Sequence, residues 1–161
     1  MKTTMSFRLV SCATLLALLA GAAGGAAVPK EAKRQAQMAA ESWLELVDQD
    51  QYAKSWEEAA PLFREAVTKE AWVNAVGRVR GTVGKLKLRK LKSAQDATNM
   101  PGMPGGRYVV IQYDTVFANR PAVETITPML DGDGTWRVSG YHVKYAPGPE
   151  QQDSIWTAGP S

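Results

Sequence analysis

The residues best suited to acid–base chemistry lie in the second half of the chain. His142 is the only histidine, and histidine is the side-chain type that changes charge near neutral pH. Glu124 lies within an apolar Val-Glu-Thr-Ile run, a setting in which a carboxylate is suited to general acid–base work. With Tyr113 or Tyr141 as hydrogen-bond donor, either residue would support isomerisation or hydrolysis of a small apolar substrate.

Both candidate bases also have a structural interpretation, which we favour. His142 shares strand parity with Trp136, so we expect it on the core face of its strand or at the rim, where a single histidine usually forms a structural hydrogen bond. Glu124 is equally explained by a cross-strand pair with Arg137 or Tyr141 on the next strand. Neither pattern is specific enough to assign a catalytic residue.

Aromatic side chains in the first half of the chain suggest a different kind of site. Trp43, Trp56 and Trp72 lie on predicted helical faces, and together with Thr115 they are candidates for an aromatic-lined pocket for a flat apolar or sugar-like ligand. The alternative is that the rings fill the space between the helices and a curved sheet. We favour this core role, because aromatic rings dominate the packing energy of small domains.

Metal and cofactor chemistry finds little support in the composition. The only cysteine, Cys12, lies near the N-terminus, and a single histidine cannot complete a zinc site. The run from Asp131 to Thr135 (Asp-Gly-Asp-Gly-Thr) resembles the start of a calcium loop, but His142 stands where such a loop needs glutamate. We interpret the run as a hairpin turn and expect neither metal nor cofactor.

The charge balance disfavours a nucleic-acid partner. Without Lys2 and Arg8, which belong to the predicted leader, 17 of the 19 basic residues remain against 16 acidic ones, a net charge of +1. The one concentrated basic stretch runs from Lys85 to Lys92. It would suit an anionic envelope polymer or lipid surface, but lysines on a solvated strand that prevent edge-to-edge aggregation explain it as well.

The N-terminus has the three parts of a secretory signal. Lys2 and Arg8 precede the apolar run Leu9–Ala20, and small residues follow up to Ala27. We predict a signal peptide over residues 1–27, cleavage near Ala27, and a periplasmic or secreted protein with no transmembrane segment after cleavage. Cys12 precedes most of the apolar run, which disfavours its use as a lipidation site.

Hydrophobic periodicity predicts helices first and strands afterwards. Helical spacing covers 30–49 and 52–59, Pro61 starts a further turn, and Thr68 is a good N-cap for a third helix. Alternation predicts strands over 83–94 (slipping at Lys90-Leu91), 108–118, 123–130 and 136–145. We therefore expect one α+β domain over 28–145, with N-terminal helices packed on a curved antiparallel sheet of about four strands, and a disordered tail over 146–161.

A set of aromatic and apolar segments lies along the predicted domain: Trp43-Leu44, Tyr52, Ser55-Trp56, Phe63, Trp72, Tyr108-Val109-Val110, Val123-Glu124-Thr125 and Trp136-Arg137-Val138 with Gly140-Tyr141. Together these segments resemble a bacterial family of unknown function, domain-of-unknown-function family 4019. The resemblance covers roughly residues 36–143 and implies no functional residues. The order of helices followed by a curved sheet is also similar to the nuclear-transport-factor-like (cystatin-like) cone, a fold that hosts enzymes and binding modules alike.

These observations together predict an exported bacterial protein that binds a ligand or partner without catalysis. The partner would be a small molecule or another envelope protein, and a homodimer through the open sheet face is a further alternative. An acid–base isomerase or hydrolase of the cone fold, using Glu124 or His142, is the competing hypothesis.

Overall fold

The protein is described here by a computed structural model that covers residues 29–98, 100 and 102–145. The predicted signal peptide (1–27) and the predicted tail (146–161) lie outside the described residues. Within the covered ranges, none of the helices combines the length and the apolar character that crossing a membrane requires.

Four helices occupy the first half of the described chain. They are α1 (Lys30–Asp48), α2 (Tyr52–Glu58), α3 (Pro61–Ala66) and α4 (Lys69–Val83). Each lies close to its predicted position. Thr68 caps α4 as expected, because the backbone N–H of Ala71 donates to its Oγ1 at 3.2 Å.

The second half forms one antiparallel meander of β1 (Leu86–Ala97), β2 (Tyr108–Phe117), β3 (Pro121–Leu130) and β4 (Trp136–Tyr145), paired in that order. This confirms the predicted α+β class with helices on a four-stranded antiparallel sheet. The first strand begins three residues later than predicted, because Val83 still belongs to α4. Gly84 then turns the chain with φ of 82°, a left-handed conformation that favours glycine.

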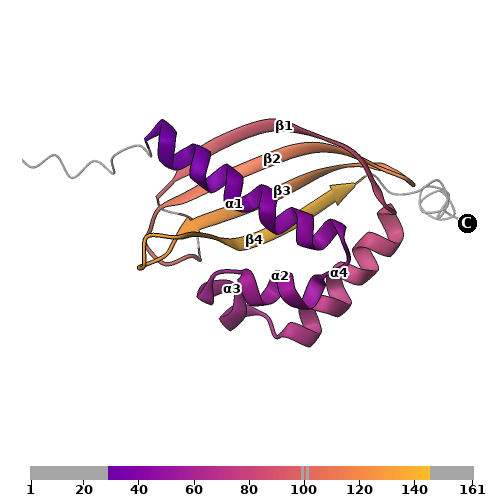
Figure 1. Ribbon diagram of the computed structural model, residues 1–161, viewed down its shortest axis with the longest axis horizontal. Coiled ribbons are helices and arrows are strands. Elements are labelled where there is room, and N and C mark those ends of the chain that lie inside the picture. Colours follow the sequence, from indigo (N-terminus) through magenta and orange to yellow (C-terminus); the bar gives the residue numbers. More distant parts are fainter. Residues whose placement is uncertain (1–28, 99, 101, 146–161) are drawn as a thin grey trace, which may run out of the picture.

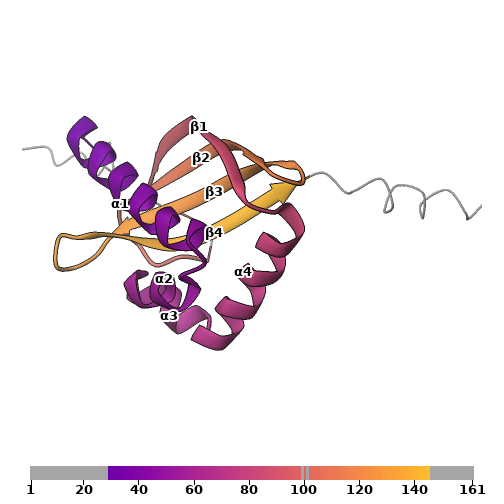
Figure 2. The same ribbon diagram turned by 45° about the vertical axis from the view of Figure 1, so that its right-hand side comes forward.

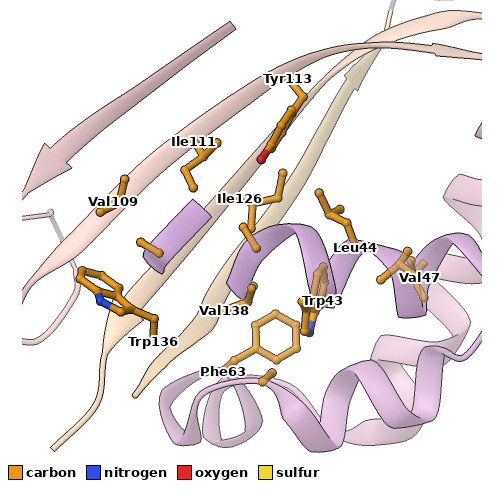
Figure 3. Packing of buried hydrophobic residues seen from close by; sticks show 14 of the residues in the cluster. Trp43, Leu44, Val47, Phe63, Val109, Ile111, Tyr113, Ile126, Trp136 and Val138 are labelled. Atoms are coloured by element: carbon orange, nitrogen blue, oxygen red, sulfur yellow. The ribbon is translucent and has the colours of Figure 1, made fainter. Parts of the chain in front are cut away.

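α1 crosses one face of the curved sheet, and α2, α3 and α4 lie past the β4 edge on the side of that covered face, while the other face is open (Figures 1 and 2). We call the covered face the inner face and the open one the outer face. The inner face carries the core, in which Trp43 and Leu44 from α1 pack with Phe63 against strand residues such as Ile111 and Val138 (Figure 3). Side chains alternate between buried and more exposed along β2 and most of β3, and the buried set faces the helices.

Extra residues in β1 and β4 interrupt this alternation. The β1–β2 register shifts at Lys87 and again at Lys92, close to but not at the predicted slip at Lys90-Leu91. The β3–β4 register shifts between Val138 and Gly140, so that Ser139 is the extra residue of a β-bulge.

The bulge in β4 overturns the expected placement of His142. Trp136 and Val138 lie on the inner face, but one inserted residue exchanges the faces of everything that follows. Tyr141 therefore turns inward, and His142, paired with Thr125, lies exposed on the outer face. The strand parity with Trp136, from which we expected His142 on the core face or at its rim, therefore does not hold beyond Ser139.

Replacing Trp43 tests the core. Its ring is only 3% exposed, and its Nε1 donates to the carbonyl oxygen of Ser55 at 2.7 Å. Trp43→Ala should lower the free energy of unfolding by about 3–5 kcal/mol in urea denaturation, because it opens a cavity and leaves that carbonyl without its donor. Met38→Ala, on an exposed position of the same helix, should change it by less than about 0.5 kcal/mol. Similar losses in both variants would contradict the described core.

Candidate functional site

A closed group of four charged side chains lies between the helices and the inner face of the sheet. We call it the charge ring, formed by Asp48 at the end of α1, Arg80 in the last turn of α4, Arg89 from β1 and Glu124 from β3. Exposed side-chain fractions are 15% for Asp48, 7% for Arg80, 14% for Arg89 and zero for Glu124. Two guanidinium groups and two carboxylates make the ring electrically neutral.

Each carboxylate of the ring contacts both arginines. The guanidinium of Arg89 donates two hydrogen bonds of 2.6 and 3.0 Å to Asp48, and its Nε donates to Oε2 of Glu124 at 2.7 Å. Arg80 closes the ring from the other side, with Nη1 2.9 Å from Asp48 Oδ1 and Nη2 3.3 Å from Glu124 Oε1. The paired geometry suits arginine, whose planar fork matches a carboxylate, better than lysine.

Two hydroxyl groups complete the surroundings of Glu124. Thr115 of β2 donates to its Oε2 and Tyr141 of β4 donates to its Oε1, both at 2.7 Å. Arg80 Nη2 also lies 3.2 Å from the Tyr141 oxygen. The ring and its two hydroxyl donors thus join two helices to every strand of the sheet.

Burial and charge shift the pKa values of two of these groups. Burial raises the pKa of Tyr141 well above its usual value, and the negative charge of Glu124 adds to this effect. Burial alone would lower the pKa of Arg89, but its hydrogen bonds to Asp48 and Glu124 outweigh burial and raise it. The tyrosine is therefore held as a neutral donor and the arginine as a cation.

The two arginines were not recognised as a site in the sequence. Simple alternation places Arg89 with Lys85 and Lys87, on the solvated face of the basic stretch. The extra residue at Lys87 instead turns Arg89 inward, opposite Thr115. The available signal was the residue type, since Arg80 and Arg89 stand as arginines beside an otherwise lysine-rich run.

A cleft opens beside the charge ring, between α4 and the second half of β4. Its volume is about 480 Å³, within the size range of small-ligand pockets. α4 packs mainly on α2, and Figure 2 shows it past the β4 edge of the sheet. Apolar and aromatic side chains dominate its walls: Trp72, Val76 and Val79 from α4, and Tyr141, Val143 and Tyr145 from β4.

Only part of the predicted pocket belongs to this cleft. Trp72 lines it, while Trp43 is buried beneath it and the Trp56 indole is half-buried, donating to the carbonyl of Val67 at 2.8 Å. The hydroxyl of Thr115 donates a hydrogen bond to Glu124 of the charge ring. The tryptophans thus take largely the core role, with Trp72 shared between core and cleft.

The predicted acid–base residues are similarly dispersed. Tyr141 lines the cleft, and His142 contributes to its rim but has its side chain on the outer face. The Tyr113 hydroxyl donates to Glu41 at 3.3 Å. Burial raises the pKa of the Tyr113 phenol, and the negative charge of Glu41 raises it further. Glu124 pairs with Tyr141 as expected, whereas Arg137 bonds Asp131 and Asp133 in the predicted hairpin turn.

This geometry limits what the site can do chemically. Both oxygens of Glu124 already accept hydrogen bonds, the side chain has no exposed surface, and the residue is not part of the cleft wall. A substrate in the cleft therefore does not reach this carboxylate. Among the described residues, no three acidic or imidazole side chains converge in a way that could hold a metal ion.

A second hollow lies on the open outer face of the sheet. It has a volume of about 640 Å³ and includes Leu88, Val116 and Val123, of which Leu88 and Val116 are 53% and 45% exposed. Lys90, Asp114 and Lys144 lie around it. This is the face through which the sequence suggests a homodimer, and the homodimer stays a prediction.

The fold and the site define a small α+β domain in which a helical layer on a four-stranded meander is held by a buried charge ring and flanked by an apolar cleft. A model of the family described as protein of unknown function, DUF4019, matches residues 39–141. The match spans well over half of the chain, so the protein belongs to the DUF4019 family. No curated protein and no solved structure matches the chain, and the cone-fold likeness stays a prediction.

Neutralising Glu124 tests the charge ring. Glu124→Gln keeps the shape of the side chain but leaves two buried arginines facing one carboxylate, so the free energy of unfolding should fall by about 3–5 kcal/mol in urea denaturation. Asp114→Asn is the matched control, because its ion pair with Lys92 is exposed and worth less than about 1 kcal/mol. Adding Arg89→Gln to Glu124→Gln should recover part of the loss. Equal effects of the two single substitutions would contradict the ring's role.

The raised pKa of Tyr141 predicts loss of stability at high pH. The unfolded chain releases the phenol proton near pH 10 while the folded state retains it, so this contribution is complete below about pH 10 and is lost as pH rises through the folded pKa. Urea unfolding of Tyr141→Phe should therefore show a smaller drop in stability than the wild type between about pH 9 and about pH 11. An unchanged drop would argue against a raised pKa for Tyr141.

Proposed function

We propose that the protein is an exported bacterial domain that binds a ligand or partner in the cell envelope without catalysing a reaction on it. The secretory pattern of residues 1–27 supports the location, and the cleft between α4 and β4 supports the binding role. The single observation that carries the proposal is the cleft itself, whose walls are apolar and aromatic while the neighbouring carboxylate is fully occupied.

The contrast between cleft and ring argues for binding rather than turnover. A catalytic base needs access to its substrate and a free lone pair. Glu124 has neither, and the side chain of His142 lies on the other face of the sheet. What the cleft offers a ligand is apolar surface from Val76, Val79 and Val143, with the ring of Trp72 at one end. Such walls stabilise a bound apolar group by removing it from water.

Native mass spectrometry tests this proposal. The chain should be produced with its leader, purified from the periplasmic fraction, and measured under gentle desolvation. We expect an additional mass that disappears on denaturation. Val79→Arg, which places a long charged side chain in the cleft, should abolish it. Asn74→Arg, at an exposed position of the same helix, should retain it. Loss in both variants, or a bare protein mass in the wild type with no envelope partner co-purifying, would contradict the proposal, as would turnover of the bound compound.

A further inference from the structure

One wall of the cleft is the unpaired edge of a β-strand. Among the described residues, β4 is the last strand of the sheet and pairs with β3 alone. Five consecutive residues of β4, 141–145, line the cleft, so the strand presents its main chain as well as its side chains. An edge strand of this kind offers free N–H and C=O groups to another extended segment.

The direction of these main-chain groups follows from one hydrogen bond. The backbone N–H of Ala60 donates to the carbonyl oxygen of Val138 at 2.8 Å, so the main chain of Val138 faces away from β3. Main-chain groups alternate along an antiparallel strand, and the extra residue Ser139 shifts that alternation by one. Tyr141 and Val143 therefore point their N–H and C=O groups into the cleft. Within the described part of the chain, nothing hydrogen-bonds to them from that side.

The opposite wall is an apolar stripe along one face of α4. Trp72, Ala75, Val76 and Val79 recur at three- and four-residue steps and all line the cleft. The helix thus covers the strand edge at a distance, leaving a groove between backbone donors and acceptors on one side and apolar side chains on the other. Toward the start of β4, the N–H of Ala60 already occupies the carbonyl oxygen of Val138, so the open part of the edge is the second half of the strand.

We propose that the cleft binds an extended peptide as an antiparallel fifth strand along β4. This inference rests on the proposed binding function and specifies its partner. Tyr141 and Val143 would exchange main-chain hydrogen bonds with alternate residues of the peptide, whose side chains continue the inner face of the sheet. Those side chains would pack against Val76 and Val79 and should be apolar.

Charge specifies the remaining positions of the peptide. Its other side chains lie on the outer face, beside His142 and Lys144. Among the described residues that line the cleft, Lys144 is the one lysine, arginine or carboxylate residue, so acidic side chains at these positions are favoured. The partner is therefore a segment in which apolar and acidic residues alternate. At about 3.3 Å per residue, the open part of β4 accommodates about five to seven residues.

A second copy of the protein fits this groove less well than a single strand. Pairing two β4 edges would bring the α4 helix of each copy against the other copy's sheet, because α4 stands along the same edge (Figures 1 and 2). A lone peptide brings no such bulk. α4 therefore leaves room for one added strand beside β4 but not for the sheet of a second copy.

Methylated peptides test the strand pairing. The probe is a fluorescein-labelled Glu-Val-Glu-Val-Glu-Val-Glu peptide, measured by fluorescence polarisation on the protein lacking only its leader. N-methylation of the valines removes the N–H groups that face β4 and should weaken binding roughly tenfold or more. N-methylation of the internal glutamates removes N–H groups that face solvent and should leave binding within about threefold. A Lys-Val-Lys-Val-Lys-Val-Lys peptide should bind more weakly than the glutamate probe.

The protein variants separate this inference from the broader proposal. Val79→Arg should abolish binding of the probe and Asn74→Arg should not. Equal affinities of the two methylated peptides, or the opposite ranking, would overturn antiparallel strand addition, as would a dimer in sedimentation velocity that blocks the probe. If the probe fails while native mass spectrometry still shows a ligand lost in Val79→Arg, the cleft binds something other than a strand, and only the present inference falls.

Discussion

The neutral charge ring is the interaction on which the rest of the structure depends. Arg80 carries the end of α4 to Asp48 and Glu124, and Arg89 ties the same carboxylates to the first strand. The alternative to complete pairing is a buried charge without a partner, which costs several kcal/mol, so the ring tolerates little change in geometry. Together with the packing of Trp72 on Tyr141 and of Val83 with Phe117, these ion pairs hold α4 beside the sheet and so help to set the width of the cleft.

The ring itself depends on two extra residues in the strands. Without the bulge at Lys87, Arg89 would point to the outer face, and without the bulge at Ser139 so would Tyr141. The second bulge also exposes His142 and turns the main chain of Val143 toward the cleft. One inserted residue in β4 thus determines the placement of a hydroxyl donor to the charge ring, the placement of the only histidine and the open edge of the strand.

The parts of the fold that depend on local patterns could be predicted from the sequence. Helical spacing located α1 and the Thr68 cap, strand alternation located β2, and the Asp-Gly pattern located the last hairpin. The site could not be predicted in the same way. Whether Arg89 faces the core or water depends on the register with β2, and a bulge of one residue leaves almost no mark in composition or periodicity. The pairing of Glu124 with Tyr141 was predictable because both lie on neighbouring strands, whereas its pairing with Arg80 joins residues 44 positions apart.

The side chain of Tyr141 belongs both to the surroundings of the charge ring and to the wall of the cleft. The hydroxyl of Tyr141 donates a hydrogen bond to Glu124, while its phenol ring lies in the cleft wall. The centroid of this phenol ring is 5.4 Å from that of Trp43 and 6.0 Å from that of Trp72. A ligand that packs on the phenol ring of Tyr141 therefore contacts a group whose position is set by the charge ring. Such a wall is rigid before the ligand arrives, and a preformed wall lowers the entropy lost on binding. Buried ion pairs add little to net stability by themselves, so under the proposed binding function the contribution expected of the charge ring is a fixed position for this wall of the cleft.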